Sequence, residues 1–230
     1  MTAIPLRPLD LHTAQPSDGQ GAPAWATQLE EVAAAEPGDW AAAFSFALDR
    51  LAGRLDPRPL ALVTTRAWMR ERGRPYAQGL ARLGAAPARL LLVCVEREAQ
   101  AIWALEEALK SGAVAGALGT VEQVAFVASR RLDFAAREGR ACAVVLRARA
   151  AEDLTAARVR WKIAALPSAD DPLDARAPGP MRWRVQVTRR RDGPPGVFEW
   201  EESDATPRLR LAAGLAGDGL VAAGRTHAAA

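Results

Sequence analysis

The sequence has little lysine and histidine, and each shortage removes a class of chemistry. Lysine occurs only at Lys110 and Lys162. Neither follows a glycine-rich turn, so the phosphate-cradling P-loop with its ammonium group is absent and ATP chemistry is not expected. The two histidines, His12 and His227, lie near the chain ends, where rigid positioning of a general base or metal ligand is not expected. We therefore predict no catalytic residue, no cofactor and no metal site.

Cysteines are also few, and long apolar runs are absent. Cys94 in LLLVCVE and Cys142 in ACAVVL lie in strand-like runs without metal-ligand spacing. This pattern predicts two buried thiols in a reducing cytoplasm. No run approaches the ~18 apolar residues of a membrane span, and no secretory signal begins the chain. We expect a cytoplasmic protein with no membrane contact.

The length of the chain limits the number of domains, and its net charge does not decide whether it binds nucleic acid. The 230 residues suit one main domain. A formal net charge of +3 is compatible with a nucleic-acid neighbour without requiring one. We predict a flexible leader over residues 1–24, a single α/β domain over 25–211 and an Ala/Gly-rich tail over 212–230.

Apolar periodicity predicts a mainly parallel sheet flanked by helices, followed by antiparallel strands. Asp39 is predicted to cap a helix whose apolar stripe runs from Trp40 to Leu51. From residue 158 the pattern changes to strict alternation in RVRWKI and MRWRVQV, and VFEWE adds a third antiparallel strand. The remaining predicted elements are strands at 60–65, 89–96, 113–118 and 141–148 and helices at 76–83, 98–111 and 121–138.

Two groups of basic residues are candidate contact sites for DNA or a protein partner. The first is predicted to project from the outer face of the antiparallel hairpin and consists of Arg158, Arg160, Lys162, Arg182 and Arg184. Guanidinium groups bind phosphate bidentately, but Glu199 and Glu201 could instead pair with these cations in a cross-strand charge ladder. The second group, Arg130 and Arg131, lies on the polar side of the helix at 121–138 and faces either solvent or a partner.

Several segments together resemble a known family. YAQGLARLG, RLLLVCVE and ALKSGAV resemble the α/β core of the RecA recombinases, and ARVRWKI with MRWRVQVTRRR resembles their terminal β-hairpin. A closer resemblance, over residues 29–211, is to the RecA-like ImuA proteins of the bacterial mutagenesis cassette, sometimes labelled SulA-like. It is carried by WALEEALKSGAV, VASRRLDFAAREG, VRWKIAALPS and MRWRVQVTRRRDGPPGVFEWE. The resemblance implies a RecA-like core.

The sequence departs from active recombinases at three places. AAAEPGDW stands at the phosphate loop and lacks its lysine and its magnesium-binding hydroxyl. Gly119-Thr120 stands where a metal-supporting aspartate is expected, and Thr65-Arg66 where a water-activating glutamate is expected. GTVEQ and RARAAEDLT are too short to serve as DNA-binding loops. We predict a degenerate P-loop and no enzymatic activity.

The ImuA resemblance implies a non-catalytic accessory protein of SOS-induced translesion synthesis and mutagenesis. It implies protein-protein interaction with an ImuB-type polymerase homologue, with the catalytic subunit of an error-prone replicative polymerase, and with RecA through the shared fold, at the nucleoid when active. Alternatives are a direct DNA-binding or RecA-modulating module, a SulA-like cell-division inhibitor, and a divergent ATPase.

Overall fold

A nine-stranded mixed sheet forms the centre of the computed structural model, which describes residues 28–52, 56–150, 152–171, 174, 176–191, 195–202 and 209–215. The strand order is β3-β2-β4-β5-β1-β6-β7-β8-β9. Neighbours from β3 to β6 pair in parallel, and β6 to β9 pair antiparallel. The strands are β1 Leu29–Ala34, β2 Leu60–Thr65, β3 Leu90–Val95, β4 Gly116–Thr120, β5 Cys142–Arg147, β6 Val159–Leu166, β7 Arg182–Arg190, β8 Gly196–Glu202 and β9 Leu209–Leu215.

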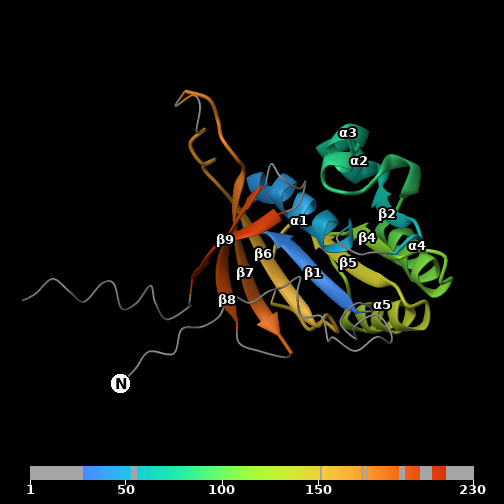
Figure 1. Ribbon diagram of the computed structural model, residues 1–230. Coiled ribbons are helices and arrows are strands. Elements are labelled where there is room, and N and C mark those ends of the chain that lie inside the picture. The colour runs from blue at the N-terminus through green and yellow to red at the C-terminus, as the bar shows by residue number, and fades with distance from the viewer. Residues whose placement is uncertain are drawn as a thin grey trace, which may run out of the picture.

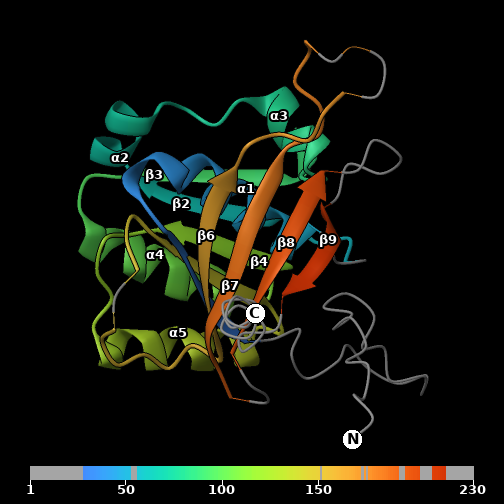
Figure 2. The same cartoon turned by 90° about the vertical axis from the view of Figure 1, so that its left-hand side faces the viewer.

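Helices cover both faces of the parallel part of the sheet (Figure 1). They are α1 Trp40–Ala52, α2 Arg66–Arg72, α3 Ala77–Arg82, α4 Glu98–Lys110 and α5 Phe126–Glu138, with short 3-10 turns at Pro37–Asp39 and Pro87–Arg89. α1 packs on one face, with α2 and α3 beside it, and α4 and α5 pack on the opposite face. Figure 2 shows the sheet between these two layers. The α/β class with a mainly parallel sheet, flanking helices and antiparallel terminal strands is as predicted.

Two apolar clusters hold these layers together. The cluster on the α1 face includes Phe46, Trp161 and Trp200, whose rings meet edge to face at 5.3 and 5.7 Å between centroids. The cluster on the opposite face joins α4 and α5 to the sheet through Leu105 and Leu132. The predicted alternation is therefore confirmed for Trp161 and Trp200, which both point to the α1 side.

Most predicted boundaries agree with the structure, and the differences have local causes. The predicted strand at 113–118 begins at Gly116, and the helix predicted from Val121 begins at Phe126. Val121 and Val124 are buried in the connection between β4 and α5. Because these two buried residues have the apolar spacing of a helix, the sequence predicted a helix that begins too early. Helix α2 was not predicted, although Thr65 caps it by accepting a hydrogen bond from the Trp68 amide at 3.2 Å.

The strand predicted at 89–96 is present, but it is partly exposed on both faces. β3 is the edge strand of the sheet, and Leu91 and Leu92 are 51% and 38% exposed. Cys94 is likewise exposed rather than buried, whereas Cys142 is buried as predicted. A continuous apolar run is typical of a central parallel strand, but it does not distinguish a central position from an edge.

The ends of the chain are only partly described. The predicted leader at 1–24 lies outside the described residues. β9 extends to Leu215 and so takes in the first residues of the predicted tail, whose remainder also lies outside the described part. None of the helices in the described ranges has the length and apolar character of a transmembrane span.

Candidate functional site

The connection from β1 to α1 stands where many α/β proteins bind a phosphate, at the carboxyl end of a central strand and the start of a helix. In this chain, backbone amides near this connection donate hydrogen bonds to the carboxylate of Asp39. Asp39 Oδ2 accepts a hydrogen bond from the Glu36 amide at 3.1 Å, and Oδ1 accepts one from the Ala165 amide at 3.0 Å. Asp39 therefore joins the loop to β6 instead of capping α1 as predicted. A phosphate at this loop would be opposed by the carboxylates of Asp39 and Glu36.

The carboxyl ends of β2 and β4 carry hydroxyls in place of acids. The Thr120 hydroxyl donates to the Thr64 hydroxyl at 2.8 Å, and both residues are buried. Thr65 is engaged as the cap of α2. Within the described residues there is no group of three or more histidine, cysteine, aspartate or glutamate side chains that could hold a metal ion. These strand ends supply neutral oxygen atoms, a poor donor set for a divalent cation.

Two adjacent glutamates in β1 are buried on opposite faces of the sheet. Glu30 lies on the α1 face, where Arg50 donates to it through Nε at 3.0 Å and Nη2 at 2.7 Å. The Trp161 indole donates to the same carboxylate at 2.8 Å. Burial tends to lower the pKa of Arg50, but the charge and hydrogen bonds of Glu30 outweigh it, and the pKa is raised. Arg50 thus stays a cation inside the core.

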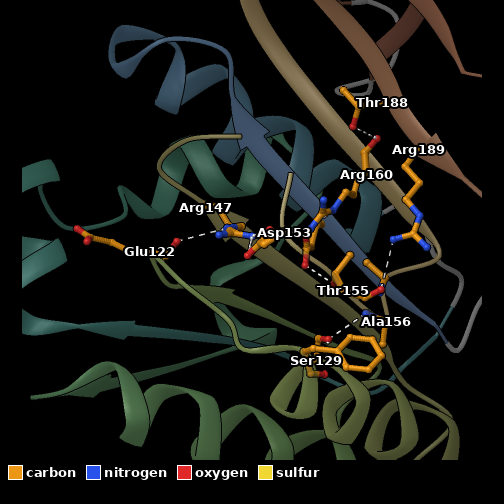
Figure 3. Close-up of polar contacts among 12 residues, drawn as sticks. Glu122, Ser129, Arg147, Asp153, Thr155, Ala156, Arg160, Thr188 and Arg189 are labelled. Carbon is orange, nitrogen blue, oxygen red and sulfur yellow. Dashed lines mark hydrogen bonds and ion pairs between the residues drawn. The ribbon is translucent and has the colours of Figure 1, made fainter. Parts of the chain in front are cut away.

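Glu31, on the opposite face, belongs to a charged network that fixes the segment between β5 and β6 (Figure 3). Arg160 Nε donates to Glu31 at 2.9 Å, and the Thr155 hydroxyl donates to it at 2.5 Å. Asp153 accepts from Arg160 at 2.9 Å and from Arg147 at 2.8 and 3.0 Å. The negative charges of Glu31 and Asp153 are thereby neutralised by the positive charges of Arg147 and Arg160. This arrangement corrects the prediction that Arg160 projects from the outer face, because its side chain is only 10% exposed.

The same segment is fastened to a helix and to a further strand (Figure 3). The Ala156 amide donates to Ser129 on α5 at 2.9 Å, and Arg189 on β7 donates to the Thr155 carbonyl at 3.5 Å. Arg147 also donates to the Glu122 carbonyl at 3.3 Å. The contacts hold the β5–β6 connection against the body of the domain.

The cross-strand charge ladder is present on the hairpin. Arg182 donates to Glu199 at 2.6 Å, and Arg184 lies 3.8 Å from the same carboxylate. Arg158 and Lys162 are half-buried, and only Arg184 of the five predicted hairpin cations is exposed. The structure therefore does not bring the five cations together as one open phosphate-binding surface.

Arg130 and Arg131 lie on the outer side of α5. The Arg130 guanidinium lies over the rings of Phe126 and Phe134, at 6.0 and 5.8 Å from their centroids. Phe126 and Phe134 are 43% and 58% exposed. Arg131 pairs with Glu106 of α4 at 3.0 Å. Arg131 therefore links the two helices, and Arg130 forms part of an exposed aromatic stripe.

The Asp153 pKa gives the charged network a pH dependence. Hydrogen bonds from Arg147 lower this pKa below its ordinary value, and Arg160 adds to the effect against the opposing influence of burial. Because the pKa is lower in the folded chain than in the unfolded chain, the ionised carboxylate stabilises the fold above its ordinary pKa. That contribution disappears as the pH falls through the folded value.

We therefore expect the wild-type chain to lose its stability advantage over Asp153→Asn progressively as the pH falls below about 4. Urea unfolding of both chains at a series of pH values measures the difference. Glu152→Gln, at the exposed neighbouring residue, is the matched control. A wild-type advantage over Asp153→Asn that stays constant from neutral to acidic pH would contradict the assigned ion pairs.

Comparison with known proteins gives the family. No protein-family model matches the chain. Protein ImuA, found in two strains of Caulobacter vibrioides, is 34% identical to it over 196 residues, which cover 80% of this chain and 78% of the relative. The chain belongs to the ImuA family. The likeness to ImuA is not confined to one motif, since it extends over most of both chains, and the predicted family is confirmed. The crystal structure of SulA from Pseudomonas aeruginosa aligns at 25% identity and a TM-score of 0.41, covering 54% of this chain and 98% of that chain.

Proposed function

We propose that this chain is a non-catalytic accessory protein of SOS-induced translesion synthesis and mutagenesis. In this proposal it acts by binding an ImuB-type polymerase homologue and the catalytic subunit of an error-prone replicative polymerase, with RecA as a further partner. The observation that carries the proposal is the 34% identity to ImuA over 80% of the chain. ImuA proteins are named for a mutagenesis cassette, and this name supports a role for the chain in the response to DNA damage.

The proposal includes a RecA-like core whose phosphate loop has become non-functional. The parallel strand order β3-β2-β4-β5-β1-β6, extended by antiparallel β7 and β8, supports such a core. Asp39 bound to the amides of Glu36 and Ala165 supports the loss of nucleotide binding, because those donors are already satisfied. The hydroxyl pair Thr64 and Thr120 at the neighbouring strand ends lacks the charge needed to hold magnesium.

Protein-protein interaction is favoured over direct DNA binding. Affinity for DNA depends on cations that are free to neutralise phosphates. On the hairpin, Arg160 is buried in ion pairs with Glu31 and Asp153, and Arg182 pairs with Glu199. The exposed aromatic rings on α5 are instead typical of protein interfaces.

The proposal is tested by partner capture together with nucleotide titration. The purified full chain is expected to retain the ImuB-type homologue in size-exclusion chromatography. Calorimetry with Mg²⁺ and ATP is expected to give a dissociation constant weaker than about 1 mM. Deleting the gene is expected to remove damage-induced mutation. A chain that retains neither polymerase protein, or that binds ATP at micromolar concentration, would reject the proposal.

A further inference from the structure

An aromatic pocket with a volume of ≈ 520 Å³ lies between α1, α2 and α3. Its lining includes Trp40 and Phe44 of α1, Trp68 of α2, and Tyr76 just before α3. The rings of Trp40 and Trp68 meet edge to face, with centroids 4.7 Å apart and an interplanar angle of 85°. Trp40 also meets Phe44 at 5.6 Å. The pocket therefore has a rigid apolar floor built from two helices.

The rim of this pocket is basic. Arg72, Arg74 and Arg82 line it, and none of its described lining residues is acidic. The Arg72 guanidinium lies over the Trp40 ring at 5.4 Å. Its Nε is buried and has no hydrogen-bond partner among the described residues, and the carboxylate of Glu71 lies 3.7 Å from Nη2. A buried donor without a partner costs free energy, which an incoming acceptor would recover.

We infer that this pocket binds an acidic segment of a partner protein, which packs a large apolar side chain against the rings and places carboxylates on Arg72 and Arg74. The inference rests on the proposed function and adds the site and the chemistry of the partner. Tryptophan, tyrosine and arginine are the residue types that dominate binding energy at protein interfaces. Carboxylates complement Arg72 and Arg74, and bidentate binding of a carboxylate suits a guanidinium group.

A single-stranded nucleic acid suits the pocket less well. Such ligands stack successive bases on ring faces arranged along a basic groove. Here the face of Trp40 is taken by Arg72, and Trp40 and Trp68 stand nearly perpendicular to each other. The rings therefore form one socket for a single side chain, with no series of parallel platforms.

Peptide binding to the full-length chain tests the inference. Overlapping synthetic peptides that tile the two polymerase proteins are titrated by fluorescence anisotropy, with oligo-dT as the nucleic-acid probe. The tightest peptides are expected to be acidic and to contain Trp, Phe or Leu. Trp68→Ala and the double variant Arg72→Gln/Arg74→Gln are each expected to weaken binding by about 30-fold. Tyr76→Ala changes a 67% exposed ring, and it is expected to weaken binding without unfolding the chain.

The control is Arg149→Gln, because Arg149 is exposed and lies outside the pocket. This variant is expected to bind the peptides as the wild type does. Tightest binding to neutral peptides or to oligo-dT, or peptide binding unchanged in all pocket variants, would overturn the inference. If the pocket variants still retain the intact ImuB-type homologue and polymerase subunit at wild-type affinity, the pocket assignment fails while the proposed function stands. If the wild-type chain retains neither protein, the proposed function fails.

Discussion

Glu30→Ala is expected to lower the free energy of unfolding by about 3–5 kcal/mol, because breaking a buried ion pair leaves a charge in the core. The Glu30 and Arg50 side chains are only 5% and 8% exposed. The substitution removes the carboxylate that accepts from both Arg50 and the Trp161 indole. Urea unfolding followed by circular dichroism measures the loss.

Two further variants separate this charge effect from general damage to the fold. Glu107→Ala, on the exposed side of α4, is the matched control and is expected to change stability by less than about 0.5 kcal/mol. The double variant Glu30→Leu/Arg50→Met replaces both charges with apolar groups and is expected to recover much of the loss. A Glu30→Ala chain within about 1 kcal/mol of wild type would show that the pair does not support the core.

Arg160→Ala is expected to cost about 3 kcal/mol for the same physical reason on the opposite face. The substitution removes the guanidinium that donates to Glu31 and Asp153, and it leaves Glu31 with the Arg147 guanidinium at 3.8 Å. Thermal unfolding and urea titration both report the change.

Arg184→Ala on the same hairpin is the control for Arg160→Ala, because the Arg184 side chain is 51% exposed and sits 3.8 Å from Glu199. Exposed pairs of this kind contribute up to about 1 kcal/mol. Equal losses in the two variants would contradict the distinction between a buried structural arginine and a surface arginine.

The positions of most strands could be predicted from local patterns, whereas the order of the strands and the buried charges could not. Leu60–Thr65 and Cys142–Arg147 are short apolar runs between turn residues, and such runs identify strands without tertiary information. The adjacent Glu30 and Glu31 resemble solvent-exposed residues in the sequence. Glu31 meets Arg160 across 129 positions of the chain, and no local pattern reports a contact at that separation.

The candidate sites show the same division between local and long-range information. The absence of a phosphate-binding lysine is visible in the sequence, whereas the bonds of Asp39 to the amides of Glu36 and of Ala165 in β6 are a consequence of folding. The aromatic pocket was missed because α2 was not predicted, so Trp68 could not be placed beside Trp40. The Thr65 cap before Trp68 was the available local signal.

The central place of β1 has a consequence for synthesis on the ribosome. β1 pairs with β5 and β6, so Leu29–Ala34 meets its neighbours only after residues 142–147 and 159–166 have emerged. Until then Glu30 and Glu31 keep their water shell, and the early helices have no completed sheet to cover. Late, long-range pairing slows folding and prolongs the exposure of apolar surface. The apolar surface of β1 and of the early helices therefore stays uncovered until synthesis has passed residue 166.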